Sequence, residues 1–537
     1  MNHSKNEPKE FSIMAWLVRE VVRGSGWALK LTLVTAGLIA LGACGEATRL
    51  VATEELVIVD ESIAYGLDPA DQWGGYYLRG AGAAEGLTRF APDGEAIPEL
   101  AESVTAIDLL IWEVKLRPNV HFWSGTPVDA EAVKASLERS RRLDAEAAAL
   151  LDGIRIEVMD PTTLHFFTKD PNPMLPITLA NYPLVIYNAA SYGEQPNPLD
   201  LQAMDLTGMF RVTSFTPRQE MVLEANNAYW GPKPQVGRIR LLQVTDSQAR
   251  LLAAQDGRTH IVGYFPPEGV AELEHTEGMN IVTVPADNIV SVYLNLRSLP
   301  LGDVRVRQAL SWAIDRQELV DLANEGLGQP APSWLASNPA YPDAAKQGYT
   351  RYDFALATVL LDEAGWKLDS DGIRKREGQP LTLRLLSWGI EKPVAEVLQS
   401  QWAKVGVVVE VQHSDDYGMI LTRRNEGNWE ALIEGWENLG DLLTIASVHF
   451  EPGGAINYGG YDDASTNALI DRLSKTFDEA DRRKLLLQIN TRASEMVPII
   501  PLFARPRITA VSTQVEGFQP HPRQGEYLVT ASLRIKK

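Results

Sequence analysis

The stretch from residue 289 to residue 316 constrains the fold most, because it joins an apolar strand to a capped amphipathic helix across a short turn. Residues 289–296 predict the strand, and the turn contains a proline and a glycine at residues 300–302. Asp303 comes next, and its carboxylate can accept the free backbone N–H groups of the first helical turn. Arg305 and Arg307 are expected to point away from the core, either solvated or in ion pairs. The core-facing stripe of the helix is Val306, Ala309, Leu310 and Ala313.

A second run of strand, helix and strand follows further along the chain. Residues 381–386 alternate as a strand, residues 393–405 predict a helix that ends at Gly406, and residues 407–411 are continuously apolar. This order predicts an α/β block with a parallel or mixed sheet. The chain has 537 residues, which is more than one hydrophobic core usually organises, so two or three domains are expected.

The N-terminal region contains further local signals. Residues 55–59 predict a first strand, and Trp112, Val114 and Leu116 alternate as a half-buried strand should. Asp129 is placed to cap a helix that continues through Arg139. A helix is also predicted to contain Tyr76 and Tyr77 and to include Glu85, Gly86 and Leu87.

The composition describes an ordinary globular protein, with 45% hydrophobic and 22% charged residues. The formal net charge is −20. Such an acidic chain argues against nucleic acid as a partner, since binding to phosphates needs clustered lysine and arginine. The charge does not identify a ligand, because net charge mainly affects solubility and long-range steering.

The single cysteine, Cys44, directly follows an apolar run at residues 31–43. The run is too short to span a bilayer and is preceded by basic residues, which is typical of a signal peptide. Residues 41–44 read Leu-Gly-Ala-Cys and resemble a lipobox, after which the cysteine is lipidated. Either Met1 or Met14 can be the start. The sequence therefore predicts an exported lipoprotein that is attached to the membrane through Cys44.

The sequence contains no recognisable catalytic motif. There is no G-x-S-x-G elbow, no Walker A loop and no H-E-x-x-H pair. The histidines beyond residue 44 have no metal-ligand spacing; they are His121, His165, His260, His275, His413, His449 and His521. We therefore expect a protein that is not an enzyme, with no cofactor and no metal ligands.

Several segments together resemble the solute-binding proteins of peptide and nickel ABC importers. Residues 293–316 are similar to the sequence pattern with which the second lobe begins in that family, N-x-x-x-P-L-x-D-x-R-V-R-Q-A-L-x-x-A-I-D-R. Residues 92–133 resemble a second family signature, and residues 226–234 match N-x-x-Y-W-G-x-x-P. The resemblance covers about residues 55 to 530.

The resemblance implies an α/β, two-lobed fold of the periplasmic-binding-protein type, class II and of the large peptide-binding form, with a hinge and a cleft between the lobes. Residues 1–43 would be the signal peptide and residues 44–54 a tether. Lobe one would be residues 55–287, with residues 507–537 returning to it, and lobe two would be residues 288–506.

The resemblance also implies a ligand-contacting loop after the apolar strand at residues 431–433. Loops at strand ends are where α/β lobes place ligand contacts. By position, Trp436 would close over a ligand, Glu437 lies beside it, and Asp441 would pair with the ammonium group of a peptide.

Four further residues are candidates on weaker grounds. Arg142 stands in a group of arginines where the nickel-binding branch uses a guanidinium for the carboxylates of a metal chelate. Asn457 and Tyr461 occupy a segment that reaches the cleft in the family, and Tyr76 is a candidate in the first lobe.

The function that the resemblance implies is capture of a solute outside the cytoplasmic membrane and its delivery to ABC permease subunits. An oligopeptide is the favoured ligand and a small nickel or other metal chelate is the alternative. The protein is expected to be a monomer. The alternatives are an exported sensor or chaperone that uses the same fold, and an exported hydrolase, for which the sequence offers no nucleophile with its base.

Overall fold

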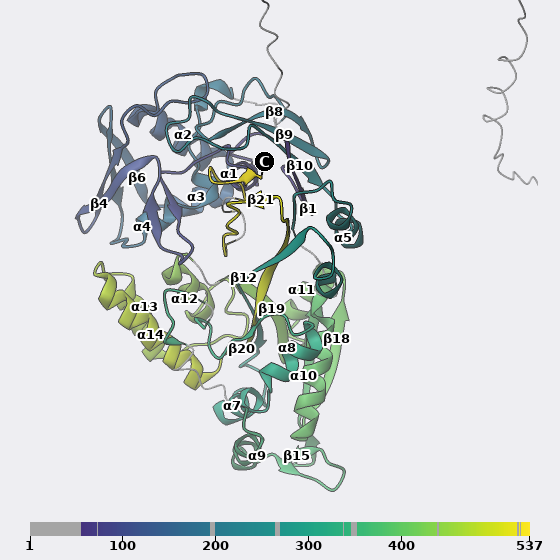
Figure 1. Ribbon diagram of the computed structural model, residues 1–537. Helices are drawn as coiled ribbons and strands as arrows, with labels where there is room; N and C mark the ends of the chain where they lie inside the picture. The colour runs from purple at the N-terminus through teal and green to yellow at the C-terminus, as the bar shows by residue number, and fades with distance from the viewer. Residues whose placement is uncertain are drawn as a thin grey trace, which may run out of the picture. The chain divides into compact units, whose positions relative to one another are not determined.

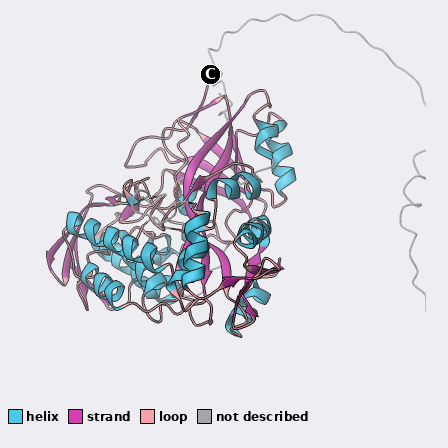
Figure 2. Ribbon diagram, turned by 90° about the horizontal axis from the view of Figure 1, so that it is seen from below, coloured by secondary structure: helices cyan, strands magenta, loops and turns pink. Residues whose placement is uncertain are grey.

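The computed structural model describes residues 55–71, 73–193, 199–263, 269–336, 338–344, 352–437, 440–523, 526 and 528–536, except for the side chains of residues 285–287 and 437. Helices and strands alternate along much of this range (Figure 1, Figure 2). Cys44 and the predicted leader and tether lie outside the described residues. Within the described ranges, none of the helices has both the length and the apolar character that crossing a membrane requires.

The main sheet has 11 strands in the order β18-β17-β19-β12-β20-β11-β1-β10-β9-β8, with β13 beside β20. We call β11, β1, β10, β9 and β8 the N-terminal half-sheet, and β18, β17 and β19 the C-terminal half-sheet. The strands are β1 (Glu55–Asp60), β8 (Phe210–Thr216), β9 (Glu220–Ala225), β10 (Arg238–Gln243), β11 (Ile261–Gly263), β12 (Met279–Leu294), β13 (Gln329–Pro330), β17 (Thr382–Trp388), β18 (Val408–Ser414), β19 (Ala431–Glu437) and β20 (Ile499–Ser512).

Smaller sheets lie outside this path. A four-stranded antiparallel sheet has the order β4-β5-β7-β6, and three sheets of two or three strands complete the set. Their strands are β2 (Thr88–Phe90), β3 (Ala96–Pro98), β4 (Ala101–Asp108), β5 (Ile111–Leu116), β6 (Ile154–Asp160), β7 (Thr163–Thr168), β14 (Lys367–Leu368), β15 (Arg374–Arg376), β16 (Gln379–Pro380), β21 (Val515–Glu516) and β22 (Arg534–Ile535).

The two half-sheets are joined by β12 and β20, which pair antiparallel from Met279↔Ser512 to Tyr293↔Ile499 (Figure 1). The register shifts between Pro285 and Ile289, about the middle of the ladder. Towards one end β20 pairs with β11, and towards the other β12 pairs with β19. These two long strands therefore carry the chain from one half-sheet to the other and back.

The helices pack beside the strands (Figure 2). Their apolar residues contribute to several hydrophobic cores. They are α1 (Gly74–Gly80), α2 (Ala130–Leu143), α3 (Ala145–Leu150), α4 (Leu175–Thr178), α5 (Ser247–Gln255), α6 (Val270–Leu273), α7 (Val304–Trp312), α8 (Arg316–Ala323), α9 (Phe354–Glu363), α10 (Lys392–Lys404), α11 (Tyr417–Asn425), α12 (Leu442–Phe450), α13 (Ala464–Leu473) and α14 (Glu479–Met496).

The buried apolar residues form separate clusters on either side of the crossover strands. One large cluster joins the C-terminal half-sheet to α7, α8, α9 and α10 through residues such as Leu310 and Trp402. Another joins the N-terminal half-sheet to α1 and the C-terminal segment through residues such as Leu56 and Val529. A third fills the space between the four-stranded sheet and α2. The chain thus has more than one core, as its length predicts.

Helix α7 confirms the local prediction at its start and corrects it at one arginine. Asp303 is the N-cap, and its side chain accepts a hydrogen bond from the backbone N–H of Arg305. The predicted stripe is buried, with Val306 fully inaccessible. Arg307 is buried as well, which the sequence reading did not expect. Its guanidinium donates to backbone carbonyls, including those of Leu301 and Met496, and burial lowers its pKa to about 10.

Two other expectations also need correction. Helix α1 contains Tyr76 and Tyr77, but it ends at Gly80, so Glu85 lies outside it and its backbone pairs with Ile186 in an isolated bridge. The strand predicted from residue 289 begins ten residues earlier, at Met279. In both cases the partner that decides the conformation is distant in sequence, so local pattern could not place the boundary.

Candidate functional site

Each half-sheet contains parallel strands whose carboxyl ends lie at one edge. Strand β1 is parallel to β10 and β11, and β17 is parallel to β18 and β19. In open α/β sheets, ligands bind in the crevice outside the carboxyl ends of parallel strands. The residues at these ends are Asp60, Gln243 and Gly263 in one half-sheet and Trp388, Ser414 and Glu437 in the other. Both edges are therefore candidates for contact with a ligand.

A cavity of about 60 Å³ lies at the carboxyl end of β1. Its charged and tyrosine side chains come from four separate parts of the chain: Asp60 ends β1, Tyr76 and Tyr77 lie on α1, Arg507 lies on β20, and Glu526 comes from the C-terminal segment. The apolar lining includes Met221, Leu241 and Leu528. The cavity, which we call the charged pocket, brings two carboxylates and a guanidinium together with tyrosine rings.

Asp60 has the clearest electrostatic signature in the charged pocket. Burial raises the pKa of its carboxyl group to about 6, and the positive charge of Arg507 opposes that rise. Gly263 stands against the same carboxylate, because a Cβ at that position would lie 3.0 Å from Oδ2 of Asp60. Any larger residue at position 263 would therefore press on the carboxylate.

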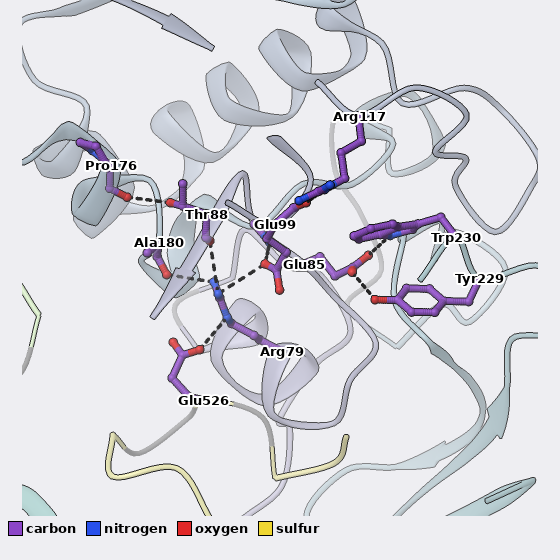
Figure 3. Close-up of polar contacts among 11 residues, drawn as sticks. Arg79, Glu85, Thr88, Glu99, Arg117, Pro176, Ala180, Tyr229, Trp230 and Glu526 are labelled. Carbon is purple, nitrogen blue, oxygen red and sulfur yellow. Dashed lines mark hydrogen bonds and ion pairs between the residues drawn. The ribbon is translucent and has the colours of Figure 1, made fainter. Parts of the chain in front are cut away.

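The buried side chain of Arg79 on α1 contacts Glu526, one of the residues that line the charged pocket (Figure 3). Its Nε donates to Oε2 of Glu526 at 3.1 Å, and Nη1 donates to the carbonyl of Ala180 at 2.9 Å. Nη2 lies 3.3 Å from the carbonyl of Thr88 and 3.4 Å from Oε2 of Glu99. Arg79 thus ties the C-terminal segment, through Glu526, to the helix that carries Tyr76.

A second buried carboxylate, Glu85, lies beside this network (Figure 3). It accepts from the hydroxyl of Tyr229 at 2.7 Å and from Nε1 of Trp230 at 3.1 Å. Burial raises the pKa of Glu85, and these two donors oppose the rise. This contact joins the segment after α1 to residues 226–234, which carry the family resemblance.

The arginine group on α2 divides into three environments. Arg139 is buried, and its guanidinium makes a bidentate pair with Asp68, with Nη1–Oδ1 at 2.8 Å and Nη2–Oδ2 at 2.6 Å. Arg141 donates to Glu138 and to the carbonyl of Ile154. Arg142 is exposed, whereas Arg141 is only partly exposed.

Trp436 lies near the end of β19 and packs half-buried against an aromatic cluster. Its ring is edge-on to His449, with centroids 6.1 Å apart. Its Nε1–H is buried without a hydrogen-bond partner among the described residues. Glu437 follows as the last residue of β19, and its side chain lies outside the described atoms.

Asp441 is the N-cap of α12. Its Oδ1 accepts from the backbone N–H of Thr444 at 2.9 Å, and its Oδ2 accepts from the Thr444 hydroxyl at 2.8 Å. Burial raises the pKa of Asp441, while these bonds and the charge of Arg523 oppose the rise. Each carboxylate oxygen can accept a further hydrogen bond, so the cap does not use up the acceptors of Asp441.

Asn457 and Tyr461 hold one loop together. The Asn457 side chain donates to the carbonyls of Glu451 and Tyr461 and accepts from the backbone N–H of Tyr461. Tyr461 is 2% exposed and its hydroxyl lies 2.9 Å from that of Thr466. These contacts give both residues a structural role in the core that contains α12, α13 and α14.

The sequence reading missed Asp60 and Arg507 as site candidates. One usable signal was present, because Asp60 directly follows the apolar strand predicted at residues 55–59, and an acidic residue at a strand end is where α/β sheets place ligand contacts. Arg507 had no such signal. It reaches the charged pocket only through the pairing of β12 with β20.

Among the described residues, no group of three or more histidine, cysteine, aspartate or glutamate side chains is arranged to hold a metal ion.

Comparison with known proteins decides the family. Residues 95–440 match the family model for bacterial extracellular solute-binding proteins, family 5, middle part. The match spans more than half of the chain. The chain belongs to this family.

Individual relatives are distant but cover most of the chain. The nickel-binding periplasmic protein of Escherichia coli K12 is 26% identical over 444 residues, which is 78% of this chain and 83% of that protein. The glutathione-binding protein GsiB of the same strain is 26% identical over 532 residues, which is 93% of this chain and 99% of that protein. A crystal structure of a nickel ABC transporter protein from Bacillus halodurans superposes with a TM-score of 0.78 at 27% identity, covering 89% and 99%.

These comparisons confirm the predicted fold class, the two-lobed α/β fold of periplasmic binding proteins. They also confirm that this chain, as a member of family 5, is a binding protein and not an enzyme. The N-terminal and C-terminal half-sheets, with their separate cores, are the sheets of such a fold.

Proposed function

We propose that this protein captures short peptides outside the cytoplasmic membrane and delivers them to the permease of an ABC importer. The observation that carries the proposal is the charged pocket, which holds both signs of charge at a strand end. A peptide in water is a zwitterion, with an ammonium group at one end and a carboxylate at the other. Charge-assisted hydrogen bonds to such groups are about twice as strong as neutral ones.

Each group of the pocket has a matching role. Asp60 and Glu526 supply negative charge for an ammonium group, and Arg507 supplies the planar donor that suits a carboxylate. Tyr76 adds a ring and a hydroxyl from α1. The pocket of about 60 Å³ is smaller than a peptide, so it would receive one end of the ligand and not the whole of it.

The remaining contacts would come from the C-terminal half-sheet. Trp436 and Glu437 stand at the carboxyl end of β19, and Asp441 begins the helix that follows. We propose that lobe one consists of residues 55–287 with the return of residues 507–537, and lobe two of residues 288–506. The crossover strands β12 and β20 would then be the hinge about which the lobes close on the ligand.

A nickel chelate is the second candidate ligand. It is supported by the similarity to the Bacillus halodurans nickel transporter protein at 27% identity. Chelators that carry carboxylates would be received by Arg507 or by the exposed Arg142. The peptide is preferred because a site for a carboxylate chelate has no use for the carboxylate of Asp60 in the charged pocket.

Export with a lipid anchor at Cys44 completes the proposal, and it rests on the lipobox-like residues 41–44. Two acyl chains give stable anchoring, which a single chain does not. Cys44→Ala should therefore release the protein from membranes, and a variant that stays in the membrane fraction after a carbonate wash would contradict the anchor.

Binding itself is tested by thermal unfolding of the wild type with added tripeptides. A ligand that binds only the folded state stabilises it by about 2.7 kcal/mol when present at a hundredfold excess over its dissociation constant. The melting temperature should rise with peptide concentration. A pool of tri- to pentapeptides that leaves the melting temperature unchanged, while nickel–histidine raises it, would favour the chelate.

A further inference from the structure

Two aromatic side chains from the two proposed lobes pack against each other. Trp112 lies on β5 in lobe one, and Phe477 lies between α13 and α14 in lobe two. Their ring centroids are 6.0 Å apart with an interplanar angle of 30°. Trp112 is 6% exposed, and Phe477 is half-buried against the core between the four-stranded sheet and α2. A side chain of lobe two is therefore partly buried in a core of lobe one.

A second contact of this kind is made by Gly440, just before α12. It has a φ of 99°, and a Cβ at this position would lie 2.7 Å from Nη1 of Arg523 and 3.0 Å from Cε1 of Phe90. Both of these side chains belong to lobe one, and the guanidinium carbon of Arg523 stands 3.9 Å from the ring centroid of Phe90. The backbone of lobe two thus approaches lobe one as closely as a residue without a Cβ permits.

A cavity of about 40 Å³ is lined by residues of both lobes. Lobe one contributes the turn before β3 and helix α4, and lobe two contributes helices α12 and α14 (Figure 1). The charged lining is Asp93 and Glu95 from the turn, with Glu479, Arg482 and Arg483 from α14. The arginines attract the Glu95 carboxylate, whereas Glu479 repels it. Because these effects oppose each other, we assign the stabilising effect of the interface to the aromatic pair.

The aromatic pair is separate from the charged pocket, since neither Trp112 nor Phe477 lines it. The chain crosses from lobe one to lobe two within β12 and returns within β20. A rotation about these strands that opens the cleft would draw the two rings apart, because each ring belongs to a different lobe. The contact between them therefore stabilises the closed conformation alone.

We propose that the pair Trp112–Phe477 is a latch that stabilises the closed conformation and sets how tightly the protein holds any ligand. This proposal rests on the proposed function, since it assumes that the lobes close about β12 and β20. The apparent dissociation constant is the intrinsic one divided by the fraction of molecules in the binding-competent conformation. A latch therefore raises the affinity for every ligand by the same factor, whereas residues of the pocket decide which ligand is bound.

The first test is calorimetry of the wild type and Phe477→Ala with Ala-Ala-Ala, Ala-Phe-Ala and Ala-Lys-Ala. Loss of the aromatic pair should weaken the binding of each peptide by one common factor, about 2- to 10-fold. A loss confined to one peptide would place Phe477 in the ligand site and overturn the latch. The matched control is Phe354→Ala, which removes a 43% exposed phenylalanine from α9 in the same lobe and should leave all three affinities unchanged. Thermal unfolding checks that each variant is folded.

The second test needs no ligand. Glu95→Cys and Arg483→Cys, combined in a Cys44→Ala chain, place thiols at two exposed positions that line the shared cavity. A short bismaleimide should cross-link them. Adding Phe477→Ala should slow the cross-linking where the ligand-free protein is mostly open, or enlarge its radius of gyration in small-angle scattering where it is mostly closed.

The two tests separate the latch from the proposed function. Equal cross-linking rates and equal radii of gyration with and without Phe477→Ala overturn the latch, whatever the ligand is. A wild type that binds none of the three peptides, in a protein whose cross-linking or radius does respond to Phe477→Ala, contradicts the proposed function and supports the latch.

Discussion

Arg79 and Glu526 form a buried ion pair across 447 residues of sequence, with Nε of the arginine 3.1 Å from Oε2 of the glutamate. Arg79 is fully buried and Glu526 is 4% exposed. Removing one partner of a buried pair leaves the other charge uncompensated, which costs about 3–5 kcal/mol. Arg79→Met should therefore lower the free energy of unfolding by about that amount, measured by urea denaturation.

Lys475→Ala is the control for this comparison, because it breaks the exposed pair between Lys475 and Asp471. Exposed pairs contribute little to stability, so the urea midpoint should not move. Equal losses in the two variants would mean that the Arg79 network does not hold the C-terminal segment in place.

His449 predicts a dependence of stability on pH. It lies between Ile445 and Tyr293, with Nδ1 2.8 Å from the Ile445 carbonyl and Nε2 2.9 Å from the Tyr293 hydroxyl, and burial lowers its pKa to about 4. In the unfolded chain histidine titrates near 6.5, so between pH 6.5 and pH 4 the unfolded state binds the extra proton. Stability should therefore fall as pH falls through this window, by about 3 kcal/mol in total.

Asp60 has the opposite effect on stability over part of this pH range. Its pKa is raised to about 6, so below that pH the folded state binds the extra proton and stability rises as pH falls. The contribution of His449 must therefore be measured as a difference. Urea unfolding of the wild type and His449→Gln between pH 4 and pH 7 should give curves that converge as pH falls. Parallel curves would show that His449 is not buried in its neutral form.

Asp60 also predicts a pH dependence of binding. A peptide ammonium group needs the ionised carboxylate, and a pKa of about 6 means that the ionised fraction falls roughly tenfold from pH 7 to pH 5. Peptide affinity measured by calorimetry should fall by about the same factor. Asp60→Asn should bind weakly with little pH dependence, whereas Asp152→Asn, at an exposed position, should behave as the wild type. A wild-type affinity that is constant between pH 7 and pH 5 would remove Asp60 from the site.

Asp441 can be tested so that its role as a cap and a role in binding are separated. Asparagine is as good an N-cap as aspartate, so Asp441→Asn should keep α12 intact, while Asp441→Ala should lower the free energy of unfolding by about 1 kcal/mol. If Asp441 also pairs with the peptide ammonium group, Asp441→Asn should weaken peptide binding by about 30-fold or more. Unchanged peptide affinity in Asp441→Asn would leave this residue with the capping role alone.

The parts of the fold that follow from local pattern were predictable. Asp303 caps α7 and Asp129 caps α2, and each cap bonds to a backbone N–H within three residues of itself. Gly406 follows α10 with a positive φ of 84°, as a residue ending a helix should. In each case the deciding interaction lies within a few residues of the chain, so the sequence contains all of it.

The charged pocket could not be predicted in the same way. Asp60, Tyr76, Arg507 and Glu526 come together only because β12 and β20 connect the half-sheets and because Arg79 holds the C-terminal segment. The prediction that Arg307 points away from the core was wrong for the same reason. Its guanidinium donates to the carbonyl of Met496, which lies 189 residues away in the sequence. Contacts at this separation depend on the whole fold, which residue spacing does not encode.

The central claim, peptide capture at the charged pocket, is tested most directly by calorimetry of the wild type, Arg507→Gln and Asp60→Asn on one set of ligands: a tri- to pentapeptide pool and nickel–histidine. The wild type should bind peptide with saturation at one equivalent, and each substitution should weaken that binding by about 30-fold or more, because it leaves a buried ligand charge unpaired. Saturable binding of nickel–histidine with no heat from any peptide, or peptide binding that is equally tight in all three proteins, would contradict the claim.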